Sequence, residues 1–267
     1  MSRIENIDFC IRYLLEQNHT QADIPAELAE KQKLFRALMN IWEPQPLSKE
    51  FLRAQNAELQ AQLTDKGVVT MEDISASSCT PHLWQGDITR LRVDAIVNAA
   101  NSQMMGCWHP LHACIDNCIH SAAGLQLRAE CAEAMNGTEC PPEHEEYTFN
   151  GTVYRHAFTT ETLITKAYNL PCRHVLHTVG PIISDGVPTK EQERQLANCY
   201  RNCLGLAEAN GCRSIAFCCI STGEFRFPNR RAAEIAVEAC KDATIKVVFN
   251  VFKDIDYDIY RELLGKG

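Results

Sequence analysis

The chain lacks the sequence features of membrane and secreted proteins. No segment approaches the roughly 18 consecutive apolar residues that a membrane-spanning helix needs. The first eight residues, Met1 to Asp8, also lack the apolar core of a signal peptide. We therefore expect a cytoplasmic protein with no membrane partner. In a reducing compartment, its 14 cysteines should be buried thiols or metal ligands, and no structural disulfide is expected.

An excess of positive charge is also missing. The chain has 26 Lys and Arg against 34 Asp and Glu, and its formal net charge at pH 7 is -8. No basic run interleaved with aromatic residues is present either, which argues against nucleic acid as a partner. With 267 residues, the chain has room for one large domain with an extension, and it is long enough to be an enzyme.

Hydrophobic periodicity divides the chain into two regions. From Arg3 to about Lys66, apolar residues recur at helical spacing, and prolines break the stretch into about three helices. We interpret residues 1–78 as an N-terminal helical extension packed on a catalytic domain of residues 79–267. Covering one edge of that domain is the simpler role for the extension, and docking a substrate is the alternative.

In the second region, strand-like runs alternate with helical patterns, which predicts a three-layer α/β sheet with ligands at the carboxyl ends of its strands. Strands are expected near residues 82–84, 95–98, 163–166, 174–179, 214–220 and 245–252, and helices at 114–135, 190–210, 229–241 and 256–264. The stretch from Asn136 to His156 has no clear period, so we expect a surface loop there. His144 in this stretch lies among glutamates, and we favour a solvated acidic segment over a metal site.

A compact set of metal-ligating residue types follows the second of these strands. Cys107, His112 and Cys114 fall within eight residues, directly before Asp116. Thiolate and imidazole are ligands that zinc prefers, and three protein ligands leave one position for water or substrate, as in catalytic zinc sites. His109 is an alternative to His112 as the third ligand. Taken alone, the set also fits an incidental cluster in a cysteine-rich chain or a reactive-cysteine site.

Polar residues also follow this strand and the strand predicted at 214–220. Asn98 and Asn101 end the strand that precedes the cysteines, where carboxamides suit either a turn or a polar ligand. Ser221, Thr222 and Gly223 lie between a buried strand and a helix, in an arrangement that can present backbone amides to a phosphate.

Six separated tracts resemble the macrodomain family in their order and spacing. They are Gly86-Asp87-Ile88-Thr89, Asn98-Ala99-Ala100-Asn101, the Asp116 to Gly124 tract, Tyr168-Asn169-Leu170-Pro171, His177-Thr178-Val179-Gly180-Pro181 and Ile220-Ser221-Thr222-Gly223. With its cysteine and histidine cluster and its N-terminal extension, the chain more closely resembles the zinc-containing macrodomains of bacteria and fungi, which are often encoded beside a sirtuin that ADP-ribosylates proteins. The resemblance implies an α/β/α fold with a mixed central sheet, and ADP-ribose as the ligand.

The resemblance also implies roles for individual residues. Asp87 would receive the adenine amino group with help from the Ile88 amide, and Asn101 would hold the distal ribose. The diphosphate would be wrapped by the loop of Ser221, Thr222, Gly223, Glu224 and Phe225, with Phe225 flanking the distal ribose. Zinc on Cys107, His112 and Cys114 would lie beside that ribose, where it would either bind a hydroxyl or activate water. Asp116 is the expected catalytic carboxylate together with Asn101, and its alternative role is that of an acidic residue at a helix N-terminus.

The function implied is that of a zinc-dependent hydrolase that removes mono-ADP-ribose from protein side chains, with acidic residues as the attachment points and a lipoyl-carrier-type protein as the substrate. An ADP-ribose reader without activity and an O-acyl-ADP-ribose esterase are the alternatives. The chain departs from many family members at Arg226, which replaces a loop glycine and would either reach a phosphate or face solvent.

Overall fold

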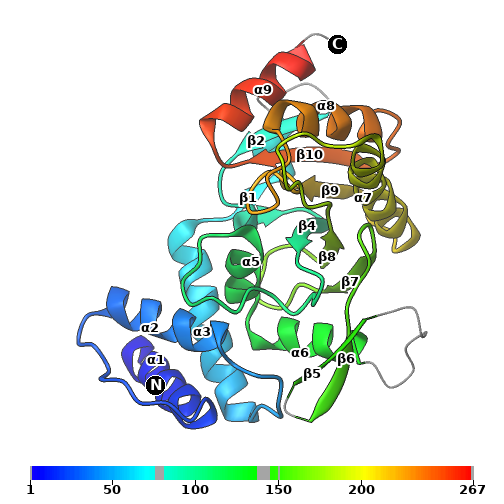
Figure 1. Cartoon of the computed structure of the whole chain (residues 1–267). Helices are drawn as coiled ribbons and strands as arrows, with labels where there is room; N and C mark the ends of the chain where they lie inside the picture. The colour runs from blue at the N-terminus through cyan, green and yellow to red at the C-terminus, as the bar shows by residue number, and fades with distance from the viewer. Residues whose placement is uncertain (1, 76–80, 137–144, 150, 266–267) are drawn as a thin grey trace.

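A six-stranded mixed sheet forms the centre of the computed structural model, which describes residues 2–75, 81–136, 145–149 and 151–265 (Figure 1). The strand order is β2 (His82–Gln85), β10 (Lys246–Val251), β9 (Ser214–Phe217), β4 (Ala95–Ala100), β8 (His174–Val179) and β7 (Thr162–Lys166). Only the β7–β8 pair within this sheet is antiparallel. The carboxyl ends of the five parallel strands therefore meet at one edge of the sheet.

Helices cover both faces of the sheet, as the alternating pattern predicts. On one face, α5 (Ile115–Ala123) contacts β4 and α6 (Leu125–Ala134) contacts β7. The other layer contains α7 (Lys190–Ala209), α8 (Asn229–Cys240) and α9 (Asp254–Gly265), with α8 packed between α7 and α9. The predicted three-layer α/β/α class with a mixed sheet is confirmed.

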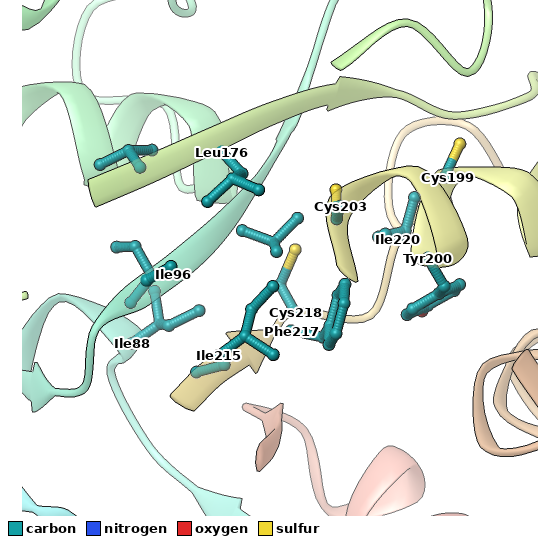
Figure 2. Packing of buried hydrophobic residues seen from close by; sticks show 14 of the residues in the cluster. Ile88, Ile96, Leu176, Cys199, Tyr200, Cys203, Ile215, Phe217, Cys218 and Ile220 are labelled. Carbon is teal, nitrogen blue, oxygen red and sulfur yellow. The ribbon is translucent and has the colours of Figure 1, made fainter. Parts of the chain in front are cut away.

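Apolar side chains of the central strands and of α7 form the main core. Figure 2 shows Phe217 of β9 near Tyr200 and Cys203 of α7, with Leu176 of β8 and Ile96 of β4 in the same core, and all five are buried. Burial raises the pKa of the Cys203 thiol well above its ordinary value, so this residue acts as a small hydrophobic side chain, as expected. The cysteines of the described residues are free thiols.

The N-terminal region forms three helices, α1 (Arg3–Gln17), α2 (Leu28–Asn40) and α3 (Lys49–Lys66), which confirms the helices read from the sequence. Ser2 begins α1 with a capping box to Glu5. These helices have an apolar core of their own, which includes Phe35, Trp42 and Leu125 of α6. Residue 78, the expected boundary between the two regions, lies outside the described residues, so the boundary stays a prediction.

A small parallel pair links the extension to the sheet. In it, β1 (Val69–Thr70) pairs with β3 (Leu91–Arg92), and the short helix α4 (Met71–Ser75) follows β1. The 3₁₀ helix η1 (Ile88–Arg90) precedes β3. None of the helices in the described ranges is long and apolar enough to cross a membrane.

Two predicted elements differ from the structure. The helix expected over 114–135 is two helices, because Gly124 adopts a φ of 96° and ends α5. The loop expected over 136–156 contains an antiparallel hairpin of β5 (Glu146–Phe149) and β6 (Thr152–Arg155). In the hairpin, Tyr147 stacks on Tyr154, and this cross-strand aromatic contact stabilises the pair. Each strand is too short for its alternation of apolar and polar residues to be recognised in the sequence. His144 lies outside the described residues.

Candidate functional site

The predicted site residues come together at the carboxyl edge of the sheet. Asp87 follows β2, Asn101 follows β4, and the Ser221 to Phe225 loop follows β9. Because these strands are parallel members of one sheet, their loops emerge at the same edge. Since β10 and β9 lie between β2 and β4 in the sheet, the loops that contain Asp87 and Asn101 are separated by the width of two strands.

Asp87 begins η1, and its carboxylate is fixed by three contacts. Thr89 donates to Asp87 Oδ1 from its backbone N–H at 3.0 Å and from its hydroxyl at 2.6 Å, and Lys66 Nζ of α3 lies 3.0 Å from Oδ2. Although burial alone would raise it, these partners hold the pKa of Asp87 below its ordinary value. Ile88 is buried and its side chain is part of the core, so that side chain is not available to a ligand.

One aromatic residue beside Asp87 was not singled out in the sequence. Phe252 directly follows β10, and its side chain is 77% exposed. The Gly86 N–H donates to Val251 O at 2.9 Å, which holds the Asp87 turn against this strand end. The sequence pattern assigned Phe252 to the strand, where an aromatic residue is unremarkable, although an exposed ring at a strand's carboxyl end can stack on a base.

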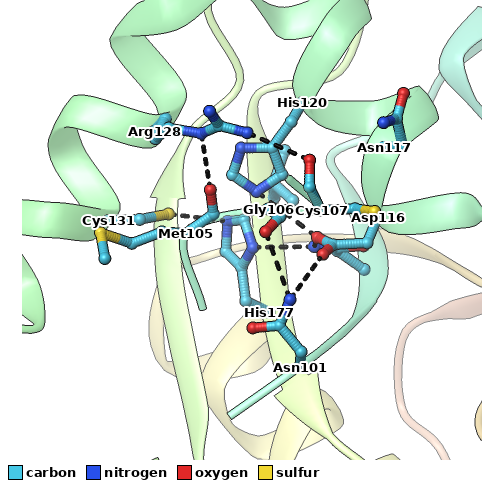
Figure 3. A network of polar contacts seen from close by, with 12 residues as sticks. Asn101, Met105, Gly106, Cys107, Asp116, Asn117, His120, Arg128, Cys131 and His177 are labelled. Carbon is cyan, nitrogen blue, oxygen red and sulfur yellow. Dashed lines mark hydrogen bonds and ion pairs between the residues drawn. The ribbon is translucent and has the colours of Figure 1, made fainter. Parts of the chain in front are cut away.

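Asp116 lies at the centre of a buried polar network (Figure 3). Asn98 Nδ2 donates to Asp116 Oδ1 at 2.7 Å, and Asn101 Nδ2 lies 3.4 Å from Oδ2 and 3.2 Å from Gly106 O. Burial raises the pKa of Asp116 to about 6, against the opposing effect of the Asn98 hydrogen bond. Both carboxylate oxygens thus fix the asparagine carboxamides, and Asp116 lies in the first turn of α5, as its alternative interpretation predicts.

The expected metal-ligating residues do lie together. The ligand atoms of Cys107, His112 and Cys114 are within 4.8 Å of one another, and Cys107 Sγ lies 3.4 Å from His112 Nδ1. Zinc bonds of about 2.3 Å to sulfur and 2.0 Å to nitrogen at a tetrahedral angle separate those two atoms by about 3.5 Å. The donor set and its spacing therefore fit a tetrahedral metal ion. Exposed His109 is not in the group.

Cys114 is held at the N-terminus of α5. Its Sγ accepts a hydrogen bond from the Asn117 N–H at 3.4 Å and so acts as the N-cap of the helix. Burial nevertheless raises the pKa of Cys114 to about 12. A metal-free Cys114 thiol of this kind is a poor nucleophile at neutral pH, whereas a bound metal ion would displace its proton.

A second Cys and His group lies deeper, formed by buried His120, Cys131 and His177. His177 is surrounded by hydrogen-bonding neighbours, with Thr165 Oγ1 3.0 Å from Nε2, and burial lowers its pKa to about 3. His120 is buried, as expected for a packing residue. Within the described part of the chain, however, neither of its ring nitrogens has a hydrogen-bond partner, although Nε2 lies 3.6 Å from Asp116 Oδ1.

The Ser221 to Phe225 loop is shaped by the neighbouring 180–183 segment. Ser221 has a φ of 64°, and its carbonyl accepts from the Phe227 N–H at 2.9 Å. The Ile183 N–H donates to Phe225 O at 2.9 Å. A side chain at Gly180 would collide with this loop, because its Cβ would lie 2.0 Å from Ser221 Oγ.

Two side chains of this region point to different surroundings. The Glu224 carboxylate lies 3.6 Å from His112 Nε2, which brings the loop beside the metal-ligating group. Arg226 is exposed, in agreement with the solvent-facing alternative, and its φ of 58° lies in the region that favours glycine. The backbone conformation of Arg226 is therefore less favourable than the same conformation would be for glycine.

Comparison with known proteins decides the family. The family model described as Macro domain matches residues 97–236. The chain belongs to the macrodomain family. A "Protein-ADP-ribose hydrolase" of Treponema medium is 48% identical over 99% of this chain and 100% of its own length. A "Probable bifunctional ADP-ribose hydrolase/ADP-ribosyltransferase" of Fusarium oxysporum is 43% identical over 69% of this chain and 31% of its own length.

A solved structure gives the same result for the fold. The Trypanosoma brucei macrodomain in complex with ADP-ribose is 29% identical, with a TM-score of 0.59 over 83% of this chain and 92% of that one. The macrodomain match begins inside β4 and ends inside α8, so it contains the asparagines, the metal-ligating group and the Ser221 loop. Asp87 and the helical extension lie outside it.

Proposed function

We propose that this macrodomain is a zinc-dependent hydrolase that removes mono-ADP-ribose from modified protein side chains. The similarity along the whole chain to a curated protein-ADP-ribose hydrolase supports the reaction class. The observation that carries the metal dependence is the convergence of two thiols and one imidazole, with a spacing that suits zinc, on the loop that directly follows Asn101.

The carboxyl edge of the sheet offers a partner for each part of ADP-ribose. Asp87 would accept from the adenine amino group, with Phe252 beside it to stack on the base. Backbone amides of Ser221, Thr222, Gly223, Glu224 and Phe225 would surround the diphosphate. Asn101 would hold the distal ribose, because its carboxamide lies at the metal-ligating end of the edge, close to Asp116 and Gly106. In this arrangement the anomeric carbon lies beside the metal site.

Cys107, Cys114 and Nδ1 of His112 would hold the zinc ion. When bound, zinc would supply Lewis-acid chemistry at a ribose hydroxyl or at a water molecule. Glu224 faces the other nitrogen of His112, which is the arrangement by which a carboxylate orients a ligating imidazole. Asp116 would fix the Asn101 carboxamide and place negative charge behind a centre that becomes positive as the bond to the anomeric carbon breaks.

For the substrate, we propose a protein ADP-ribosylated on an acidic side chain, and a lipoyl-carrier-type protein in particular. The similarity to a fungal protein named as both hydrolase and ADP-ribosyltransferase supports a functional link to a transferase, for which a sirtuin-type enzyme is our proposal. An O-acyl-ADP-ribose ester would fit the same site, since it presents the same ribose to the same residues. In a reader without activity, zinc on this ligand set would only shape the loop.

These alternatives are separated by one assay. Release of ADP-ribose is measured from a protein modified on glutamate, from the same protein modified on serine, and from O-acetyl-ADP-ribose. We expect rapid release from the glutamate-linked protein, with at least about tenfold slower release from the other two. Tight ADP-ribose binding without release from any substrate would identify a reader, and preference for the small ester would identify an esterase.

The proposed role of Asp87 gives a separate prediction. Asp87→Ala should weaken ADP-ribose binding by about tenfold, because a hydrogen bond to a charged acceptor contributes about 1.5 to 3 kcal/mol and water replaces part of it. Its specific effect is on base recognition. The wild type should prefer ADP-ribose to the analogue with hypoxanthine in place of adenine, and the variant should bind both equally by calorimetry. A variant that keeps the preference would rule out the adenine contact.

A further inference from the structure

The loop that carries the metal-ligating group, residues 102–114, is held by the N-terminal extension. Arg36 of α2 donates to His112 O at 2.9 Å, and its guanidinium also donates to Asn117 Oδ1 at 2.7 and 3.1 Å. Asn117 in turn donates from Nδ2 to His109 O at 2.9 Å. One extension side chain thus restrains the backbone of a ligand residue directly and, through Asn117, a second point of the same loop.

Asn40, the last residue of α2, makes a second connection. Its Oδ1 accepts from the Leu111 N–H at 3.0 Å, and its Nδ2 donates to Ser121 Oγ of α5 at 3.0 Å. The side chain is 2% exposed, so water does not compete for these bonds. Leu111 adopts a φ of 59°, an unfavourable conformation for leucine that such a contact helps to keep.

Arg128 of α6 joins the same two parts of the molecule, and Figure 3 shows its guanidinium beside Met105 and Cys107. It is 2% exposed and donates to Met105 O at 2.7 Å and Cys107 O at 3.3 Å in the ligand loop. From the same guanidinium, Nη1 donates to Asn40 O and Trp42 O at the end of α2, each at 2.9 Å. The carbonyls at the end of this helix stabilise the buried cation.

The polar contacts of α2 with the loop differ from those expected if the extension only covered one edge of the domain. Apolar packing would bury side chains of the extension, whereas here α2 binds polar main-chain atoms of a loop that has no regular secondary structure. An irregular loop that is ordered before binding loses less conformational entropy when the ligand arrives. The cost of bringing two thiols and an imidazole together would then be met during folding of the chain.

We propose that the N-terminal helical extension is a positioning element of the metal site, in which Arg36 and Asn40 hold the ligand loop in its metal-binding conformation. The inference rests on the proposed metal site. The extension contributes no metal ligand in this proposal. Loss of its contacts to the loop should therefore weaken zinc affinity without changing the number of zinc ions bound per chain. By reciprocity, metal binding should stabilise the docking of α2 to the same extent.

The test compares Arg36→Gln with Lys33→Gln. Both replace one cation of α2, but exposed Lys33 pairs with Glu30 of the same helix and, among the described residues, makes no hydrogen bond to the loop. Zinc affinity is measured by competition with a chromophoric chelator. We expect Arg36→Gln and Asn40→Ala to bind zinc about 10- to 100-fold more weakly than the wild type, with one ion per chain at saturation. Lys33→Gln should match the wild type, and metal-free Arg36→Gln should bind ADP-ribose as the metal-free wild type does.

Excess zinc should restore the turnover of Arg36→Gln. Zinc would not restore turnover if Arg36 were a catalytic residue or if the variant were misfolded. Equal zinc affinity in the Arg36→Gln and Lys33→Gln proteins would overturn the inference and leave the metal site intact. A wild type that binds no zinc would instead refute the proposed function. Hydrogen exchange of the unmutated protein gives a second measurement: zinc should slow exchange in α2, and unchanged exchange there would also overturn the inference.

Discussion

Replacing Cys114 with serine is expected to abolish zinc binding and to lower turnover by at least about 100-fold, because the metal loses one of three protein ligands and its Lewis-acid contribution is several kcal/mol. Serine keeps an oxygen that can accept from the Asn117 N–H, so the cap of α5 is preserved and the fold should survive. ADP-ribose affinity should stay within a few-fold of the wild type, since the proposed adenine and diphosphate contacts are made elsewhere. Metal content, turnover and calorimetric affinity are measured on one preparation.

Two histidines of the same loop provide the matched control. His112→Ala should reproduce the Cys114→Ser result, whereas His109→Ala should leave metal content and turnover unchanged, because exposed His109 is not in the ligand group. Loss of ADP-ribose affinity with normal turnover of the bound substrate would contradict the assignment of Cys114 as a metal ligand. Loss of zinc in His109→Ala but not in His112→Ala would exchange the roles of the two histidines.

Gly180→Ala is expected to have the opposite effect, with loss of ADP-ribose binding and retention of zinc. The added Cβ would lie 2.0 Å from Ser221 Oγ and 2.9 Å from Ile220 Cγ2, so the start of the diphosphate loop must move. Ser221 and Ile220 are both buried, so a shift of their side chains displaces packed neighbours. We expect the dissociation constant for ADP-ribose to rise at least tenfold, which corresponds to about 1.4 kcal/mol. The metal-ligating residues are on another loop and should bind zinc normally.

Gly205→Ala is the control for this substitution. Gly205 lies on the exposed face of α7, where an added Cβ meets no atom within 4 Å. Alanine there should stabilise the helix by up to about 1 kcal/mol and leave ligand binding unchanged. If Gly180→Ala binds ADP-ribose as tightly as Gly205→Ala does, the Ser221 loop does not form the diphosphate site.

The sequence predicted the layers of the fold and the convergence of its loops because both follow from local patterns. Buried strand segments such as residues 95–97 and 215–217 read as apolar runs, and parallel strands must bring their carboxyl ends to one edge. The ligand group was also predictable, since Cys107, His112 and Cys114 are close along the chain. A turn of a few residues is sufficient to bring such side chains together.

Contacts between distant segments could not be predicted in this way. Arg36 and Asn117 are separated by 81 residues, and no periodicity indicates that a surface-like arginine of one helix will bind the loop before another. The β5 and β6 hairpin depends on cross-strand pairs and on Phe149 lying against Trp108, with ring centroids 5.2 Å apart. The exposure of Phe252 could not be predicted either. The pattern indicates that a strand is present, but it does not indicate where the neighbouring strands end.

The central claim is that hydrolysis depends on one zinc ion held by Cys107, His112 and Cys114. The most direct test strips the purified protein of metal, adds zinc in substoichiometric steps, and records bound zinc and the rate of ADP-ribose release from a glutamate-linked protein at each step. We predict no release before zinc is added and a rate that rises in proportion to bound zinc up to one ion per chain. A full rate in the stripped protein, or saturated zinc without release, would contradict this account.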